Sequence, residues 1–176
     1  MTMRVACRHL FALAAIAALL AACATPPSPP APAPVNVEAM VAKIRFDAGA
    51  AEPREELAIQ PLRDPVVEDL RAQARKAETE KRYPDAVAAL DRALAETADD
   101  PSLLQDRAEA ALLVRDFAGA ETFAQRAYTV GAQVGPLCRR HWGTILAVRR
   151  LRADAAAVAE AEKQFAACKI TAPPRY

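Results

Sequence analysis

Two residue types on which much enzyme chemistry depends are scarce in this chain. Serine occurs only at positions 28 and 102, and histidine only at positions 9 and 141. The chain therefore has too few serine and histidine residues to favour a serine nucleophile with a histidine base, or a zinc site built on several imidazoles. A glycine-rich phosphate loop is also missing from the sequence. We expect a protein that is not an enzyme and that holds no cofactor or metal.

Aromatic residues and an excess of one charge sign are missing as well. Aromatic side chains make up 5% of the chain, whereas 53% of its residues are apolar and alanine is prominent among them. Strands need β-branched and aromatic side chains, while alanine, leucine, arginine and glutamate favour helices, so we expect an all-α fold. Lys and Arg number 23 against 22 Asp and Glu. This balance lacks the basic surplus of nucleic-acid-binding domains, and no nucleic-acid partner is expected.

Residues 1–22 are typical of an export signal. Arg4 and Arg8 precede an apolar run at 10–20, and its eleven residues are too few for a permanent membrane span, which needs about 20. The run leads into Leu20-Ala21-Ala22-Cys23, which resembles the lipobox of bacterial lipoproteins. The resemblance implies cleavage before Cys23 and acylation of its thiol, with palmitate among the chains. The mature protein would then be attached to a membrane.

The residue after Cys23 bears on the destination. In lipoproteins of this type, an Asp at that position is the usual signal for retention in the inner membrane. Ala24 therefore implies the periplasmic face of the outer membrane. The alternative is cleavage by signal peptidase I after Ala22-Cys23-Ala24, which fits the small-x-small rule and would release a soluble periplasmic protein.

A proline-rich stretch follows the lipidation site. Six of the 14 prolines lie between positions 25 and 34, a composition that favours extended polyproline II. We therefore expect residues 23–35 to act as a tether.

The segment at 36–63 is ambiguous in the sequence. Apolar residues at 37, 40, 41 and 44 fit one face of a short helix, although Val41, Ile44 and Phe46 also fit a strand. A glycine and two prolines follow, at 49, 53 and 61. We expect an irregular connection, with a short helix as one option, that runs over the surface of the helical domain.

Helix-start signals recur at a nearly constant interval in the rest of the chain. Asp64-Pro65, Asp100-Pro101 and Gly135-Pro136 place proline in a first helical turn, 36 and 35 residues apart. A second break follows in each unit, and after it small residues recur at 86, 120 and 155. Each unit therefore consists of two tightly joined helices. In the third unit, Gly143 follows Trp142 inside a predicted helix, which indicates a close helix crossing.

This pattern resembles the tetratricopeptide repeat, whose period is 34 residues and whose small residues lie where two helices cross. The resemblance covers three units, at about 65–100, 101–134 and 136–169, in a domain at 64–170 that leaves a tail at 171–176. It implies an α-solenoid of stacked helix pairs. The third unit matches less well, and its register is open by one residue. A plain alanine-rich helical bundle would share the periodicity and is the alternative.

The same resemblance implies a concave surface lined by the first helix of each pair. Its inward positions carry both charge signs and modest apolar surface, which suits an extended peptide or a partner's helix. These positions are Glu68, Arg71, Arg75, Glu78, Gln105, Glu109, Leu112, Arg140, Thr144 and Val148. The alternative is that they belong to ordinary solvated helix faces.

Two cysteines remain once the signal and the acylated residue are set aside. An even pair in an exported domain favours a disulfide between Cys138 and Cys168. One lies near the start of a predicted helix of the third unit and the other near the end of its antiparallel partner, so the two should meet. A metal site or a thiol nucleophile at Cys138 and His141 would lack further ligands or an orienting group.

Together these features predict an adaptor for a complex of the bacterial cell envelope. Its partner would be a protein bound in the groove, the membrane would serve as attachment, and no small-molecule substrate is expected. Two alternatives remain. One is a structural or regulatory subunit buried in an envelope oligomer, and the other is a soluble periplasmic repeat protein.

Overall fold

The computed structural model describes residues 34–49 and 64–169, and within these ranges the chain is all-helical, with no strand. The expectations for the export signal, Cys23, nearly all of the tether and the tail concern residues outside this description. The helices are α2 (Val37–Gly49), α3 (Pro65–Thr79), α4 (Tyr83–Glu96), α5 (Pro101–Leu113), α6 (Phe117–Val130), α7 (Gly135–Leu151) and α8 (Ala155–Ala167).

Aspartate side chains begin four of these helices. Asp64, Asp100, Asp116 and Asp154 each precede a helix and accept a hydrogen bond from a backbone N–H of its first turn. Proline stands in the first turn of α3, α4, α5 and α7, where its missing N–H costs no helical hydrogen bond. These starts explain why the Asp-Pro pairs in the sequence marked helices.

The two helices of each pair are joined by a turn with a left-handed residue. Lys81, Arg115 and Ala153 have φ angles of 58°, 62° and 55°. Beside the first two, the N–H of Arg82 donates to the carbonyl of Ala77 over 2.8 Å, and that of Asp116 to the carbonyl of Ala111 over 2.9 Å. Such bonds satisfy carbonyl groups that the helix end leaves free and reverse the chain tightly.

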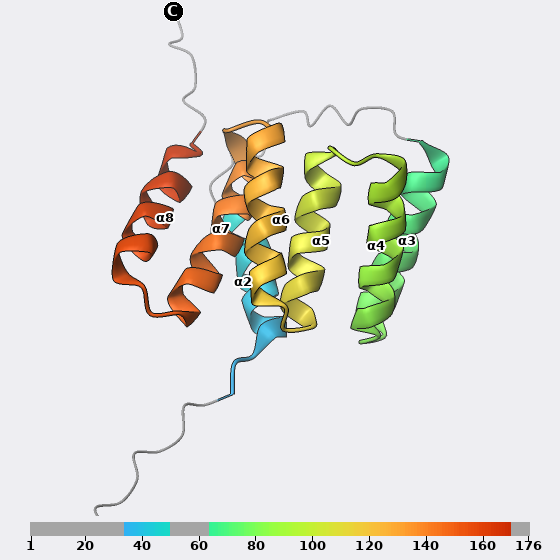
Figure 1. Cartoon of the computed structure of the whole chain (residues 1–176), viewed down its shortest axis with the longest axis horizontal. Helices are drawn as coiled ribbons and strands as arrows, with labels where there is room; N and C mark the ends of the chain where they lie inside the picture. The colour runs from blue at the N-terminus through green and yellow to red at the C-terminus, as the bar shows by residue number, and fades with distance from the viewer. Residues whose placement is uncertain (1–33, 50–63, 170–176) are drawn as a thin grey trace, which may run out of the picture. The chain divides into compact units, whose positions relative to one another are not determined.

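Helices α3 to α8 pack in chain order, each against the next, and α5 also contacts α7. Helix α2 packs against α7 and α5, and in Figure 1 it runs behind α6. It lies antiparallel to α7, because its end at Ala48 meets Arg139 while Ile44 lies beside Gly143. All seven helices belong to one compact unit that begins at Asn36.

Alanine forms much of the core. One cluster of buried side chains joins α3, α4 and the near side of α5, and a second joins α5, α6, α7 and α8. Small side chains let the helix axes approach closely, and many of the alanines in the described helices lie where two helices pack together. The alanines in these clusters are Ala74, Ala77, Ala86, Ala89, Ala93, Ala108, Ala110, Ala124 and Ala161.

Two elements bear on expectations that the sequence left open. Residues 37–49 form a regular helix, which is the helical option for this segment and not the strand. In the third pair, α7 has 17 residues, against 15 in α3 and 13 in α5, so its partner α8 starts late, at Ala155. Val158, rather than Ala155, therefore takes the position that Ala86 and Ala120 hold in the earlier pairs.

None of the described helices combines the length and the apolar character needed to cross a bilayer.

Candidate protein-binding groove

The residues predicted to line a groove fall into two groups. Glu68, Arg71, Arg75 and Glu78 on α3, with Arg140 on α7, keep contact with solvent. The others lie on α5 and α7, the two helices against which α2 packs, and have no exposed surface. These buried residues are Gln105, Glu109, Leu112, Thr144 and Val148. The predicted groove is therefore open along α3 and at Arg140, and closed at the buried positions of α5 and α7.

The open part is a cavity of about 490 Å³ bordered by α2, α3, α4, α5 and α7. Ala74, Ala86 and Leu90 supply its apolar lining. Charged side chains from α2, α3, α5 and α7 line it, and its volume lies in the range of sites that bind small ligands. The charged lining consists of Arg45, Arg71, Arg75, Glu78, Asp106 and Arg140.

Seven side chains of alternating sign form a continuous chain of ion pairs along this surface. It connects α2, α3, α5 and α7, and we call it the ion-pair chain: Glu68, Arg71, Asp106, Arg140, Glu109, Arg45 and Glu78. At one end, Arg45 holds Glu78 with two hydrogen bonds, of 2.6 and 3.0 Å. At the other, Arg71 donates to Asp106 over 2.6 and 3.0 Å.

Glu109 lies at the centre of the ion-pair chain and is fully buried. The Nε of Arg45 lies 2.6 Å from its Oε2, and Nη2 of Arg140 lies 2.7 Å from its Oε1. Burial opposes ionisation of this carboxyl, but the two guanidinium groups and the amide of Gln105 outweigh burial and lower the pKa of Glu109. Glu109 is therefore a fixed anion that holds α2 and α7 together.

The paired arginines are fixed cations for the same reason. Burial alone would lower the pKa of the Arg45 guanidinium, but Glu78 and Glu109 raise it. Arg140 and Arg71 respond in the same way to the carboxylates beside them. Arg75 differs, because its exposed guanidinium faces the cavity and makes no ion pair with any residue in the described ranges. Its charge is thus available to a ligand.

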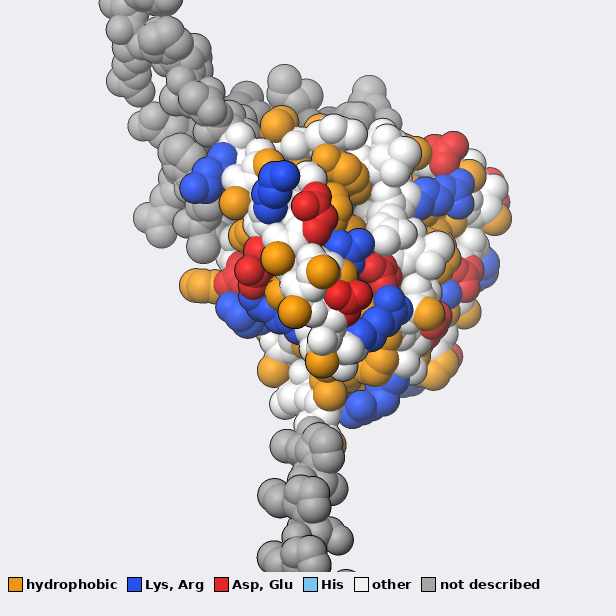
Figure 2. All heavy atoms as spheres, turned by 60° about the vertical axis from the view of Figure 1, so that its left-hand side comes forward, with side chains coloured by type: hydrophobic (Ala, Val, Ile, Leu, Met, Phe, Trp, Pro, Cys, Tyr) orange, Lys and Arg blue, Asp and Glu red, His pale blue; other side chains and the backbone are white. Residues whose placement is uncertain are grey.

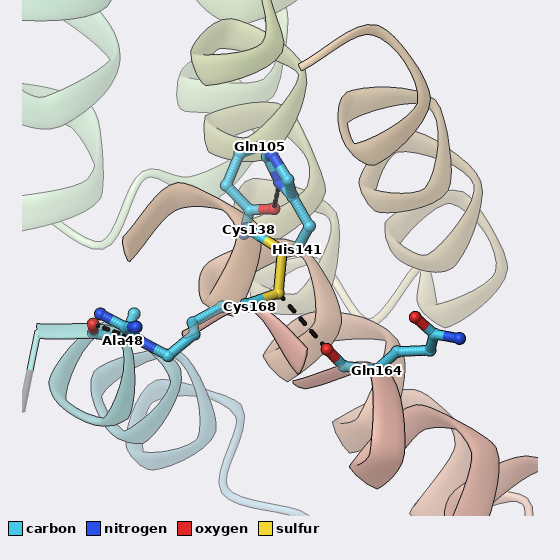
Figure 3. Close-up of a disulfide and its surroundings, with 7 residues drawn as sticks. Ala48, Gln105, Cys138, His141, Gln164 and Cys168 are labelled. Carbon is cyan, nitrogen blue, oxygen red and sulfur yellow. Dashed lines mark hydrogen bonds between the residues drawn. A yellow bond between two sulfur atoms is a disulfide. The ribbon is translucent and has the colours of Figure 1, made fainter. Parts of the chain in front are cut away.

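A neutral polar network lies beside the ion-pair chain. The Nε2 of Gln105 donates to Glu109 and to Thr144, each over 2.9 Å. Its Oε1 lies 2.7 Å from Nδ1 of His141, as Figure 3 shows. Since an amide oxygen can only accept, Nδ1 of His141 carries the proton. Burial, assisted by the charge of Arg140, lowers the pKa of His141 to about 4. The imidazole is therefore neutral near pH 7.

Helix α2 covers α5 and α7 with one apolar stripe. Val37, Val41, Ile44 and Ala48 are its buried residues, and their spacing places them on one face. At the end of α2, the Nε of Arg139 donates to the carbonyl of Ala48 over 3.0 Å (Figure 3). A cation at this position stabilises the negative end of the helix dipole.

A second cavity, of about 650 Å³, lies on the other side of α2, between α2, α7 and α8. Met40, Leu146 and Phe165 contribute apolar surface to it, with Lys43 and Glu162 among its charged residues. Figure 2 brings the α8 side of the molecule forward and shows charged side chains of both signs interspersed with apolar ones there. Helix α2 therefore has open space along both flanks.

The disulfide expected from the sequence is present in the structure. The sulfur atoms of Cys138 and Cys168 lie at disulfide distance, and their Cα atoms are 5.6 Å apart (Figure 3). The N–H of Gly135 also donates to the carbonyl of Cys168 over 2.7 Å. The start of α7 and the end of α8 are therefore joined by a covalent bond and a hydrogen bond.

Two charged groove residues, Arg45 and Asp106, were not predicted from the sequence to line the groove. Arg45 lies in the segment that we expected to be irregular, so no groove position was assigned there. Asp106 could have been predicted from its spacing in the sequence, because the arginines with which it forms ion pairs, Arg71 and Arg140, lie 35 and 34 residues away, about one repeat interval. Charges of opposite sign one period apart therefore mark contacts between equivalent positions of neighbouring pairs.

The described groove offers guanidinium, carboxylate, amide and methyl groups, which recognise charge and shape. Within residues 34–49 and 64–169, no group of three or more His, Cys, Asp or Glu side chains is arranged to hold a metal ion. No protein-family model matches the chain. No curated protein is significantly similar to it in sequence.

Proposed function

We propose that this protein is a non-enzymatic binding module of the bacterial cell envelope, held at the periplasmic face of the outer membrane by acylated Cys23. Its helical domain, which resembles tetratricopeptide repeats, would bind a segment of a protein partner on the surface formed by the first helices of the pairs. The lipobox-like sequence and the proline-rich stretch support the anchor. The recurrent helix starts and left-handed turns support the repeat.

The observation that carries the binding role is the cavity along α3. Arg71, Glu78 and Arg140 hold defined positions there through ion pairs, so little side-chain entropy is lost when a ligand binds. Arg75 adds a guanidinium that makes no ion pair with any described residue. A partner segment with a carboxylate opposite Arg75 and an apolar side chain against Ala86 and Leu90 would match this lining.

A crosslinking experiment tests the binding role. A photoactivatable amino acid replaces Thr79, an exposed residue at the cavity, and the crosslinked partner is identified from intact envelopes by mass spectrometry. We expect Arg75→Glu to reduce the yield of this crosslink at least fivefold, because it reverses the available charge. The matched control is Arg92→Glu, an equal charge change at an exposed site on α4 away from this cavity. Equal loss in both variants, or loss in neither, would contradict the proposal.

The anchor is tested separately. The mass of the mature protein should exceed that of the chain beginning at Cys23 by the mass of its acyl groups. Cys23→Ser should move the protein out of the membrane fraction. A lipid-free mature protein that begins after Ala24 would instead support release into the periplasm.

A further inference from the structure

Helix α2 occupies the surface on which the proposed function places the partner. It packs against α5 and α7, which together carry six of the ten predicted groove residues; five of these are buried, and Arg140 keeps contact with solvent. It is held by a single apolar stripe, the ion pairs of Arg45, the contact of Ala48 with Arg139, and a hydrogen bond of 3.0 Å that the Tyr83 hydroxyl donates to Glu38. Open cavities of about 490 and 650 Å³ border it on both sides. The surface is therefore wider than the helix that covers it.

The two helices under α2 carry side chains typical of a solvated surface. Gln105, Glu109 and Thr144 are fully buried and joined by hydrogen bonds. Burying such groups is costly, and permanent helix contacts in a core are predominantly apolar. If α2 left, Glu109 would keep its ion pair with Arg140 and gain water in place of Arg45. The loss of α2 therefore leaves no charge both buried and unpaired at this position.

The length of chain also allows α2 to leave while it stays attached. Fourteen residues, 50–63, separate Gly49 from Asp64, the residue that begins α3. A fully extended segment of that length spans roughly 45 Å. The start of α2 lies at the end of the predicted tether. Undocking of α2 therefore requires no rearrangement of helices α3 to α8.

We propose that α2 is a resident, displaceable ligand of this surface, and that the partner inserts an amphipathic helix in its place. The inference rests on the proposed function and specifies the partner. Val37, Val41, Ile44 and Ala48 set the pattern that the incoming helix must reproduce, with apolar residues at i, i+4, i+7 and i+11. A basic residue at i+8 takes the position of Arg45 between Glu78 and Glu109.

An intramolecular helix is a strong competitor. Because α2 is joined to its own binding surface, its effective concentration is of millimolar order. A free helix therefore binds the intact protein weakly until α2 is displaced. The affinity for a helix added in trans should rise once α2 is prevented from docking.

The test uses the full-length chain and a fluorescein-labelled synthetic peptide of residues 36–49. In the Val41→Asp, Ile44→Asp double variant, two acidic side chains replace buried residues of α2. We expect this variant to bind the peptide at least tenfold more tightly than the unmodified chain, by fluorescence anisotropy. The matched control adds the same two charges at exposed positions of α2, as Ala39→Asp with Phe46→Asp, and should bind like the unmodified chain.

The peptide itself provides a second comparison. Arg45→Glu in the peptide should abolish binding, because it places a carboxylate against Glu109 and Glu78. Lys43→Glu, an equal charge change at an exposed residue whose ion-pair partner among the described residues is the partly exposed Asp47, should reduce binding less than threefold. No gain of binding by a folded double variant, or equal binding of both peptides, would overturn the proposal. A dimer with exchanged α2 helices, detected by light scattering, would make a second copy the occupant and would also overturn it.

Hydrogen exchange of the unmodified chain keeps the proposal testable if the double variant fails to fold. Because docking and undocking of α2 leave helices α3 to α8 in place, the amides of α2 should exchange at least tenfold faster than those of α5 and α7. Equal protection would make α2 a permanent part of the core and would overturn the inference. If the Thr79 crosslink still depends on Arg75 while the peptide fails to bind, the result supports the proposed function and contradicts only the displacement of α2 by a partner helix.

Discussion

At the scale of single residues, Glu109 is the group on which the arrangement of charges depends most. It pairs with Arg45 of α2 and with Arg140 of α7, and it has no exposed surface. Removing one partner of a buried ion pair is strongly destabilising, because it leaves the other charge uncompensated.

Glu109→Gln should therefore lower the free energy of unfolding by about 2–3 kcal/mol, since both arginines keep some access to solvent. The control is Glu78→Gln, which removes the other partner of Arg45 at a partly exposed site and should cost less than about 1 kcal/mol. Urea denaturation of the three proteins measures both changes. Equal losses in the free energy of unfolding would show that the burial of Glu109 does not increase its contribution to stability.

His141 predicts a specific dependence of stability on pH. In the unfolded chain its pKa is near 6.5, whereas in the folded protein it is about 4. Between these values the unfolded chain binds a proton that the folded protein does not, so stability falls as the pH falls. We expect the unmodified chain to lose roughly 2 kcal/mol from this group between pH 7.5 and 5.

The comparison variant is His141→Gln, which does not titrate and can still donate to Gln105. Its free energy of unfolding should change less over the same interval than that of the unmodified chain. Urea denaturation at three pH values measures the slopes. Parallel slopes would mean that other groups cause the pH dependence.

The predicted groove residues were chosen from the repeat register. Arg71, Arg75, Glu78 and Arg140 line the cavity along α3. Gln105, Glu109, Leu112, Thr144 and Val148 are buried on α5 and α7. Periodicity shows which face of a helix a residue occupies, whereas it does not show that a distant segment such as α2 covers that face.

At the scale of helices, one contact between α2 and α7 is made at Gly143. A Cβ atom added there would lie 3.4 Å from Cγ2 of Ile44 and 3.7 Å from Phe165, which is ordinary van der Waals contact. The close crossing predicted for Gly143 is thus with α2, and it leaves room for a methyl group.

Gly143→Ala should therefore stabilise the protein by about 0.5–1 kcal/mol, because alanine loses less backbone entropy in a helix than glycine. Gly119→Ala is the contrasting case. A Cβ there would overlap the Asp116 carboxylate that begins α6, so the helix-start hydrogen bond would be disturbed and stability should not rise. Thermal denaturation of both variants distinguishes the effects, and a destabilising Gly143→Ala would show that the crossing is tighter than described.

Helix positions were predictable wherever the sequence carries the helix-start chemistry. Asp64-Pro65 and Asp100-Pro101 begin α3 and α5 as expected, because an aspartate side chain and a proline act within one turn. Two features depend on longer-range effects. Because α7 is longer than α3 and α5, α8 begins at a later position in its pair. The sequence of residues 37–49 left the choice between helix and strand open, and in the structure this segment is a helix that packs against α7 and α5.

At the scale of the whole molecule, the disulfide closes the last pair of the array. Cys138 and Cys168 are 30 residues apart, and a loop of that size restricts the unfolded chain by roughly 3–4 kcal/mol in the chain-entropy model. The double variant Cys138→Ser, Cys168→Ser should lose a comparable free energy of unfolding.

The measurement is urea denaturation of the unmodified chain, oxidised and reduced, beside the double variant. The reduced chain and the variant should have similar free energies of unfolding, both well below that of the oxidised chain. If reduction leaves the free energy unchanged, the hydrogen bonds and packing of α7 and α8 already hold the pair without the disulfide.

The antiparallel pairing of α2 with α7 has a kinetic consequence. Helices α3 to α8 each pack on the next helix in the chain, whereas Arg139 and its acceptor on α2 are 91 residues apart. Local contacts close short loops and form early, while distant ones pay more loop entropy. We therefore expect helices α3 to α8 to assemble first and α2 to add to a surface that already exists.

Val41→Ala should then speed unfolding and leave the refolding rate nearly unchanged in stopped-flow measurements. During synthesis, α2 would therefore leave the ribosome before α3 to α8 but would pack against α5 and α7 only after they have formed.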